Sequence, residues 1–307
     1  RAAMNPILSF GQDRIYYFDA YGQLYRNALV GKSEEVLSIP NVQMIEGVLW
    51  PDSGNNFITL GKTAGYDGDY LRLYLAKNSQ FRDLGINVES VAWLAGGEKY
   101  VYVWRRGDGG RELKTAVAET NQYSKVADLS GSFNLIASPK GDIALLQEPA
   151  SQDATRKVFL VNLSDGKIST LLDRGNNSHL LFSPDGGKLL FTRVNSQSGK
   201  PELWLFVFGA KTFKNLGLAT SSLKAVWSAD SKKFYYALPA QISSEDLVLD
   251  APIKDTLHVY DLGSGQGSGL AFSGPDADFR EMLVKSDGLM LFFRNGWDGK
   301  IYGMNLK

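Results

Sequence analysis

The chain of 307 residues contains no cysteine and only two histidines, His179 and His258. The lack of cysteine excludes disulfides, cysteine-ligated zinc, iron–sulfur clusters and thiol nucleophiles. Both histidines lie within or beside expected strands, so a Ser-His-Asp triad would need one of them at the mouth of a loop. No Gly-x-Ser-x-Gly elbow follows a strand and opens a helix. We therefore expect no catalytic residues, no metal and no cofactor.

The chain also lacks an excess of charge and any long apolar run. Lys and Arg number 33, as do Asp and Glu, which argues against a binder of nucleic acid phosphates. No run approaches the ~18 to 20 apolar residues that span a bilayer, so we expect no membrane insertion by this segment. Because the first residue is Arg1 and not Met, we expect that a signal, an anchor or another domain once preceded it.

Glycine is plentiful, and it marks a repeat. Tight turns recur at spacings of 43, 43, 44, 45, 45 and 57 residues, around Gly11, Gly54, Gly97, Gly141, Gly186, Ser231 and Gly288. An apolar strand precedes and follows each turn, a third strand comes next, and a weaker fourth closes the unit. Seven units of four short antiparallel strands predict an all-β fold, a seven-bladed β-propeller forming one domain over residues 1–307. A β-sandwich is the alternative, but it needs no such period.

The turns also carry a family resemblance. Ser183-Pro184-Asp185-Gly186, followed by an apolar strand, resembles the TolB-like (WD-repeat-like) propeller repeat, and partial copies begin near Trp50, Ser138, Trp227 and Lys285. The chain departs from WD-repeat proteins because it lacks their Trp-Asp dipeptide at strand ends and their Gly-His pair. TolB-like propellers are frequently bacterial envelope proteins. The resemblance therefore implies an extracytoplasmic location, periplasmic or on the cell surface, with anchoring by sequence upstream of Arg1.

Two structural expectations follow from the repeat. Pro sets φ in this turn, Asp bonds the backbone ahead and Gly takes the positive φ, so the motif is interpreted as structural. The last unit is about 13 residues short, and residues 1–10 align with the first strand of a blade, so the deficit falls on the fourth strand of the last blade. That strand lies upstream of Arg1, or the blade has three strands, or a partner supplies it; we favour the first explanation.

The connections between second and third strands are long and dissimilar, and in a propeller they share one face with the fourth-to-first connections. They span residues 61–69, 105–111, 147–156, 193–201 and 238–255. The longest is acidic and bounded by prolines, and it is expected to cap the face or fold a short helix. Since variable loops on a rigid scaffold usually carry binding, this face is the candidate binding face.

Several loop residues are candidates for ligand binding, and each also has a simpler explanation without a ligand. Tyr66, Asp67 and Asp69 belong to a turn whose two carboxylates suit Ca²⁺, although a solvated turn is favoured. The tip from Arg105 to Arg111 is basic and includes an Arg-Gly-Asp triplet, which chance readily explains. Trp297 stands on a turn and suits stacking against a sugar or a peptide side chain, although packing is favoured. The full candidate set is Tyr66, Asp67, Asp69, Arg105, Arg106, Asp108, Arg111, Arg193, Arg294, Trp297 and Asp298.

These observations predict a non-enzymatic scaffold that recognises a protein or peptide through its loop face. A carbohydrate partner is the next hypothesis, either bound or processed by paired carboxylates, which converge only in space. A third is the propeller module of a larger peptidase. The glycine-rich run from Gly263 to Gly269 is interpreted as a flexible connection, because no helix and no Gly-Lys-Ser/Thr follow it.

Overall fold

The computed structural model describes residues 3–8, 13–19, 21–29, 34–37, 45–51, 56–62, 69–150, 155–175, 177–240 and 252–306. Within these ranges the fold is all-β, with two short 3₁₀ helices, η1 (Ala95–Gly97) and η2 (Ser222–Lys224). The strands form seven separate antiparallel sheets in sequence order, which confirms the predicted seven-bladed β-propeller. No helix in the described ranges is long and apolar enough to cross a membrane.

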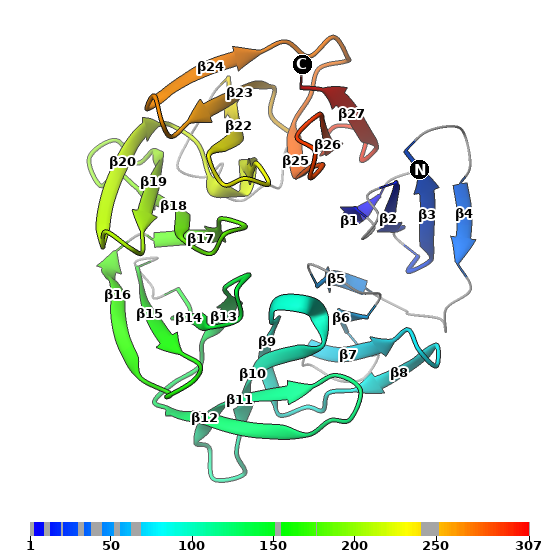
Figure 1. Ribbon diagram of the computed structural model, residues 1–307, viewed down its shortest axis with the longest axis vertical. Coiled ribbons are helices and arrows are strands. Elements are labelled where there is room, and N and C mark those ends of the chain that lie inside the picture. Colours follow the sequence, from blue (N-terminus) through cyan, green and yellow to red (C-terminus); the bar gives the residue numbers. More distant parts are fainter. Residues whose placement is uncertain are drawn as a thin grey trace. The chain divides into compact units, whose positions relative to one another are not determined.

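The chain forms two compact units, one of Arg1–Leu8 with Asn176–Lys307 and one of Ser9–Gly175. The single domain over residues 1–307 stays a prediction. Figure 1 shows the sheets of the second unit in order along the chain. Its strands are β2 (Arg14–Phe18), β3 (Leu24–Ala28), β4 (Glu34–Leu37), β5 (Ile45–Leu49), β6 (Phe57–Lys62), β7 (Asp69–Leu75), β8 (Gln80–Asp83), β9 (Val88–Trp93), β10 (Lys99–Arg105), β11 (Arg111–Val117), β12 (Tyr123–Leu129), β13 (Asn134–Ala137), β14 (Ile143–Gln147), β15 (Arg156–Asn162) and β16 (Ile168–Gly175).

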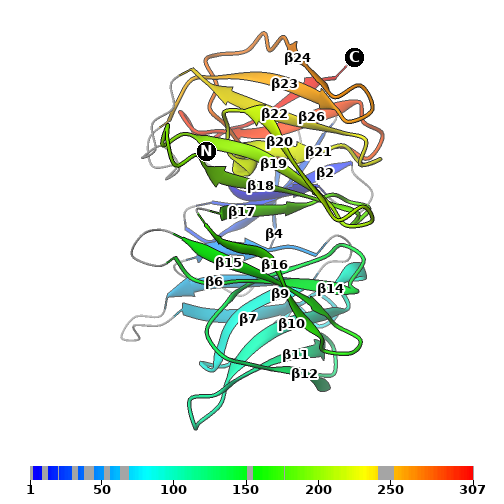
Figure 2. The same cartoon turned by 90° about the vertical axis from the view of Figure 1, so that its left-hand side faces the viewer.

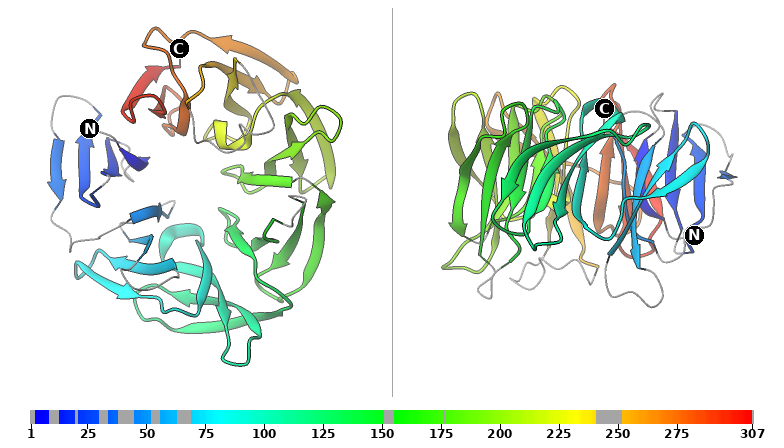
Figure 3. Two further views of the ribbon diagram at one scale, coloured as in Figure 1. Left: turned by 180° about the vertical axis from the view of Figure 1, so that it is seen from behind. Right: turned by 90° about the horizontal axis from the view of Figure 1, so that it is seen from below.

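The other unit holds the last three blades and the N-terminal strand. Its strands lie side by side within each sheet and each sheet is twisted, as Figures 2 and 3 show for β17–β20. The strand β1 comes first in the order β1-β2-β3-β4, which confirms residues 1–10 as the first strand of a blade. The strands are β1 (Met4–Leu8), β17 (Asn177–Phe182), β18 (Lys188–Val194), β19 (Pro201–Val207), β20 (Thr212–Leu218), β21 (Ala225–Trp227), β22 (Lys233–Pro239), β23 (Asp255–Asp261), β24 (Gln266–Leu270), β25 (Phe279–Val284), β26 (Met290–Asn295) and β27 (Ile301–Asn305).

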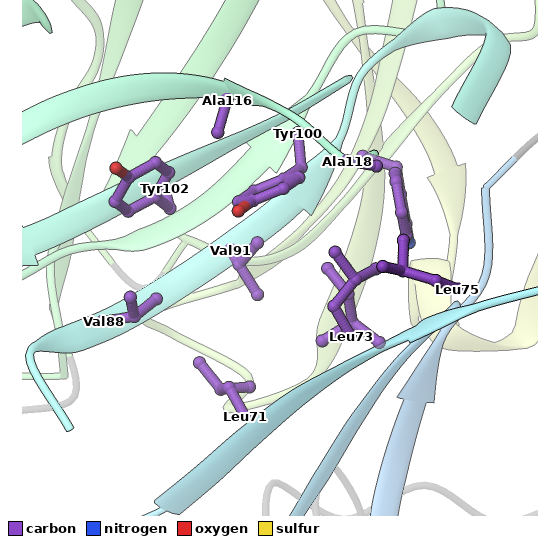
Figure 4. Packing of buried hydrophobic residues seen from close by; sticks show 11 residues of the cluster. Leu71, Leu73, Leu75, Val88, Val91, Tyr100, Tyr102, Ala116 and Ala118 are labelled. Atoms are coloured by element: carbon purple, nitrogen blue, oxygen red, sulfur yellow. The ribbon is translucent and has the colours of Figure 1, made fainter. Parts of the chain in front are cut away.

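Apolar side chains between neighbouring sheets form the core. A strand directs alternate side chains to its two faces, and strands that are apolar on both faces need a neighbour on each side. Between β7 and the next sheet, Leu71 and Leu73 share a cluster with Val91 and Tyr100; Figure 4 shows these side chains. Fully burying one such aliphatic side chain contributes about 1.5–3 kcal/mol. The blades are thus stabilised chiefly by their neighbours.

Tryptophans at the ends of first strands connect consecutive blades. The indole Nε1 of Trp93 donates to the carbonyl of Leu49 at 2.9 Å, 44 residues earlier. Trp227 makes the same contact to the carbonyl of Leu181 at 3.3 Å. Both rings are buried. These repeated tryptophans are therefore structural links at equivalent positions of two blades.

The Ser-Pro-Asp-Gly turn is structural, as predicted. The hydroxyl of Ser183 accepts from the Lys188 amide at 2.9 Å and donates to Asp185 Oδ1 at 2.6 Å. In the next blade Ser228 bonds Asp230 in the same way, also at 2.6 Å. Ser231 takes the glycine position with φ 57°, and its hydroxyl accepts from the Asp185 amide at 3.0 Å. The turns of two neighbouring blades are thereby joined.

The last sheet, β25-β26-β27, has three strands in the described residues, which confirms that the deficit falls on a fourth strand. Every other third strand contains at least two buried residues, whereas β27 contains none. The difference arises because nothing in the described residues covers β27 in the way that β24 covers β23. Which of the three explanations applies stays a prediction.

The expected contrast in loop length is only partly present. In the β9–β12 sheet the second-to-third connection is residues 106–110. It is no longer than the first-to-second turn of the β17–β20 sheet, residues 183–187. The strands β10 and β11 extend further than the sequence suggested, with Arg105 paired to Arg111. The proposed cap or helix in the longest connection falls largely on residues 241–251, which lie outside the described residues.

Candidate functional site at the loop face

In each blade the start of the first strand, the end of the second and the start of the third meet at one end of the sheet. In the β17–β20 sheet, for example, Arg193 of β18 lies between Asn177 of β17 and Glu202 of β19. We call this end the loop face. In the unit that contains Asn176–Lys307, it brings together charged residues from different blades.

A buried lysine lies at this end of the β21–β24 sheet, just before the first strand β21. Lys224, the last residue of η2, places Nζ 2.6 Å from Asp255 Oδ2 and 2.6 Å from Asp278 Oδ1. Arg280 Nε approaches the second oxygen of Asp278 at 2.7 Å. The side chains of Lys224, Asp255 and Asp278 are at most 3% exposed. Two cations and two anions compensate each other, which a buried ionic group requires. We call these four residues the buried ion cluster.

The position of Asp255 within the buried ion cluster shifts the pKa of its carboxyl group. Burial raises its pKa to about 6, against the opposing attraction of Lys224. Its Oδ2 also accepts from the Phe279 amide at 2.8 Å, whereas Oδ1 is buried with no hydrogen-bond partner in the described residues.

Three first strands contain a residue with positive φ, and one of these residues, Glu281, follows Arg280 of the buried ion cluster. Asn5, His179 and Glu281 adopt φ of 49°, 48° and 47°, each on the first strand of its sheet. Positive φ is uncommon for residues other than glycine and costs energy, although Asn and His adopt it more readily than Glu does. The pairing register shifts at His179 and again at Glu281, as in a β-bulge. Glu281 Oε1 accepts from Arg294 Nη2 at 2.9 Å, and its buried Oε2 has no partner in the described residues.

A hydroxyl cluster fixes the connection that carries Lys224. Thr192 Oγ1 lies 3.2 Å from Ser221 Oγ and 3.0 Å from Ser222 Oγ, and it accepts from the Ser222 amide at 2.8 Å. Ser222 Oγ donates to the carbonyl of His179. All three hydroxyl groups belong to buried residues. They hold η2 in place and thereby set the position of the lysine.

Trp297 and Asp298 lie on the turn between β26 and β27. The Trp297 side chain is 54% exposed, and its amide donates to Asn295 Oδ1 at 3.2 Å. The same Oδ1 accepts from the Asp278 amide at 3.0 Å. Asp298 accepts from the Lys300 amide at 3.0 Å and from the Tyr302 hydroxyl at 2.8 Å. Asp298 therefore shapes the turn, and Asn295 connects the exposed tryptophan to the buried ion cluster.

Arg193 and Arg294 lie at the same end of their sheets but make different contacts. Arg193 is exposed, with its guanidinium 5.6 Å from the Trp204 ring centroid. Arg294 is half-buried beside Glu281, and its Nε has no hydrogen-bond partner in the described residues. Both residues belong to the loop face but not to the buried ion cluster.

In the other unit, the arginines of the β10–β11 tip are paired with carboxylates. Arg111 binds both oxygens of Glu89, at 2.7 and 3.1 Å, and Arg105 lies 3.9 Å from the same group. Arg106 bonds Asp108 at 3.1 Å. The backbone bond from Gly110 lowers the pKa of Asp108; burial opposes this lowering, and the Arg106 guanidinium adds to it. The tip is therefore locally charge-compensated, not a free basic patch.

The proposed calcium turn lies largely outside the described residues. Tyr66 and Asp67 lie outside the described residues, and of Asp69 only the backbone, the first residue of β7, is described. Across the described ranges, no group of three or more His, Asp or Glu side chains is placed to hold a metal ion. Binding of Ca²⁺ at this turn stays a hypothesis.

The residues that sequence reasoning missed are those that converge from different blades. Their signal was charge at the edges of apolar strands, as in Ser-Leu-Lys before β21 and Asp-Phe-Arg-Glu at the start of β25. That signal does not say which charges meet, because the meeting depends on blade packing. The missed residues are Lys224, Asp255, Asp278, Arg280, Glu281 and Asn295.

No family model and no curated protein matches this chain. Among solved structures, oligogalacturonate lyase from Vibrio parahaemolyticus is 11% identical with a TM-score of 0.70, over 100% of this chain and 91% of the lyase. TolB from Acinetobacter baumannii is 16% identical with a TM-score of 0.51, over 98% of this chain and 75% of TolB. Tricorn protease is 14% identical with a TM-score of 0.65; 99% of this chain matches about a third, 33%, of that protein. At these identities the likeness shows the fold that this chain shares with TolB and with two kinds of enzyme.

Proposed function

We propose that this protein is a binding module that recognises a protein or peptide partner through its loop face. The observation that carries the proposal is Trp297, an exposed aromatic side chain on a turn that Asn295 holds in place. Large aromatic side chains dominate binding energy at protein interfaces, and a rigid support lowers the entropy lost on association. The buried ion cluster supplies that support through the shared oxygen of Asn295.

The charged groups around Trp297 are expected to affect the specificity of binding more than its affinity. The Arg294–Glu281 pair is half-buried, and the Lys254–Asp276 pair is exposed, at 2.6 Å. Rim charges mostly set the association rate and the choice of partner. A binding role follows more directly from this arrangement than catalysis does, because Asp255, whose pKa is raised, is fully buried within its ion pair.

The test is a pull-down from extracts of the native source, followed by titration of the recovered partner against purified variants. Trp297→Ala should weaken binding about 30-fold or more, as expected for a hot-spot aromatic. Phe213→Ala is the matched control, because Phe213 is 46% exposed on the fourth strand β20 of the same unit. If both variants retained the partner equally, the proposal would be contradicted.

Carbohydrate recognition is the second candidate, because exposed aromatic rings on turns also stack on sugars. Tyr21 is 87% exposed and stands on the equivalent turn between β2 and β3. A glycan array with the wild-type protein separates the two candidates. Binding to a glycan that Trp297→Ala or Tyr21→Ala abolishes would favour sugar over protein.

We also propose an extracytoplasmic location, either periplasmic or at the cell surface. The support is the resemblance of the Ser183–Gly186 turn to the TolB-like repeat, together with the fold shared with TolB. Fractionation of the native source with antibodies against this chain tests it. Recovery of the protein in the cytoplasmic fraction alone would contradict the location.

A further inference from the structure

Arg193 is an exposed arginine at the loop-face end of β18. Its register partner on β19 is Glu202, and opposite charges at facing positions of two strands normally attract each other. Both oxygens of Glu202 accept other bonds instead, Oε1 from the side-chain amide of Asn195 and Oε2 from that of Asn215, each at 2.8 Å. Within the described residues the Arg193 guanidinium makes no hydrogen bond and no ion pair. Its donors are therefore open to a ligand.

The Trp204 ring restricts the position of this guanidinium. The guanidinium carbon of Arg193 lies 5.6 Å from the centroid of the ring, which belongs to the neighbouring strand β19. Contact with an aromatic ring stabilises a cation and leaves its N–H groups available to other acceptors. A planar guanidinium binds a carboxylate through two parallel hydrogen bonds. Asp and Glu side chains are the groups through which a protein partner supplies a carboxylate.

Leu223 of η2 presents an apolar side chain beside this end of β18. It is 39% exposed, although the residues on both sides of it are buried. Ser222 before it lies 3.0 Å from Thr192 through their hydroxyl oxygens, and Lys224 after it belongs to the buried ion cluster. Since its neighbours are held in place, Leu223 loses little conformational entropy when a partner packs on it.

Arg193 and Leu223 lie close enough to contact one short peptide. Thr192, which precedes Arg193, accepts a hydrogen bond from the Ser222 amide at 2.8 Å, and Ser222 precedes Leu223. Because one Cα step covers about 3.8 Å, the Cα atoms of Arg193 and Leu223 are at most about 14 Å apart. An extended peptide covers that distance in about four residues.

We propose that Arg193 and Leu223 form a recognition site for an acidic peptide segment of the partner. Arg193 binds an Asp or Glu side chain, and Leu223 packs against an apolar side chain within about four residues of it. The inference rests on the proposed function, because both residues belong to the loop face, and it adds the chemistry of the segment that binds there.

The probe is a phage library of random peptides about 12 residues long, which is enough to reach both side chains. Selection on the wild-type chain should enrich peptides with Asp or Glu near an apolar residue. Selection on Arg193→Glu should enrich Lys or Arg at the acidic position instead. Lys214→Glu is the matched control, because it makes the same change of charge at an exposed residue of β20 in the same unit, and it should select as the wild type does.

Synthetic copies of a selected peptide, amidated at the C-terminus so that only side chains carry carboxylates, are then titrated by fluorescence anisotropy. Arg193→Glu should weaken binding about tenfold or more, and Leu223→Ala about three- to tenfold. Changing the acidic residue of the peptide to Lys should restore part of the affinity for Arg193→Glu. Thermal melts of each variant establish that the fold is intact.

Two outcomes would overturn the inference: no enrichment of acidic peptides on the wild-type chain, or equal affinity of the selected peptide for Arg193→Glu and the wild type. Trp297→Ala, titrated with the same peptide, separates this inference from the proposed function. If Trp297→Ala weakens binding and Arg193→Glu does not, only the recognition of an acidic segment fails. If Arg193→Glu weakens binding and Trp297→Ala does not, the role of Trp297 in the proposed function fails.

Discussion

At the scale of single residues, residues of the same type have different structural roles because their neighbours differ. Asp185 shapes a turn at the surface, whereas Asp255 is fully buried beside a lysine. Their pKa values move in opposite directions, to about 2 and about 6. Hydrogen bonds to the charged form account for the first shift and burial for the second. The sequence gives no sign of this difference, since both residues stand beside apolar strands.

Asp185→Asn should reduce stability at neutral pH by about 1 kcal/mol, a value kept low because the carboxylate is 47% exposed and screened by water. Burial works against the charged form, but bonds from Ser183, Lys188 and the Gly187 amide outweigh it. Because the folded pKa lies below the unfolded value, this stability is present above about pH 4 and is lost as pH falls towards 2. Urea midpoints of both proteins should therefore converge near pH 2; a gap that persists there would contradict the assignment.

Lys224→Met should destabilise the protein by about 3–5 kcal/mol at pH 7, because it leaves Asp255 buried without its cation. The folded pKa of Asp255 is already above its unfolded value. The stability linked to its proton is thus fully present below about pH 4 and lost as pH rises through about 6. Denaturant titrations should show the variant recovering part of its deficit between pH 7 and pH 5.

The control for this prediction is Lys224→Met combined with Asp255→Asn, which removes the stranded charge as well as the lysine. The double variant should be less sensitive to pH than Lys224→Met over the same range. If both variants respond equally to pH, then Asp255 is not the titrating group.

At the scale of elements, most of the fold was predictable and the site was not. The spacing of Gly54, Gly97 and Gly141 located the first two strands of their blades, because each strand pair is read from residues adjacent in sequence. Loop lengths were harder, since β10 and β11 extend to Arg105 and Arg111 through polar residues. The buried ion cluster could not be predicted from the sequence, because Lys224 and Asp278 are 54 residues apart and meet only when two blades pack.

The edge of β27 gives a prediction at this scale. Bonds from the Asn295 amide to the Lys300 carbonyl and from the Leu306 amide to the Leu289 carbonyl, both 2.9 Å, frame its pairing with β26. Alternation then directs the Tyr302 and Met304 amides into the sheet and the Gly303 amide to the outer edge. In the isolated chain, native-state hydrogen exchange should be fast for Gly303 and slow for its two neighbours. Slow exchange at all three would show that a further segment covers β27.

At the scale of the whole molecule, the repeat accounts for the contacts that stabilise the fold. Without cysteine, and without a metal site in the described residues, stability comes from apolar packing between sheets and from bonds that join one blade to the next. The Trp93 indole and the Ser231 hydroxyl are two such bonds. A scaffold of this kind leaves the loop ends free to vary. The turns therefore identified the fold, whereas the loop ends differ from blade to blade.

The N-terminal segment provides the last prediction. Residues 1–8 belong to the same compact unit as β25, and the Ala3 amide donates to the Gly299 carbonyl at 2.8 Å. Deleting residues 1–8 removes this bond and a strand, and it should lower the Tm by roughly 5 °C or more, given 2–4 °C per kcal/mol for a protein of about this size. Ala3→Pro removes the amide donor alone and should cause a smaller shift in the same direction. Calorimetry on the three proteins measures both effects, and an unchanged Tm after the deletion would mean that β1 adds nothing to the stability of its unit.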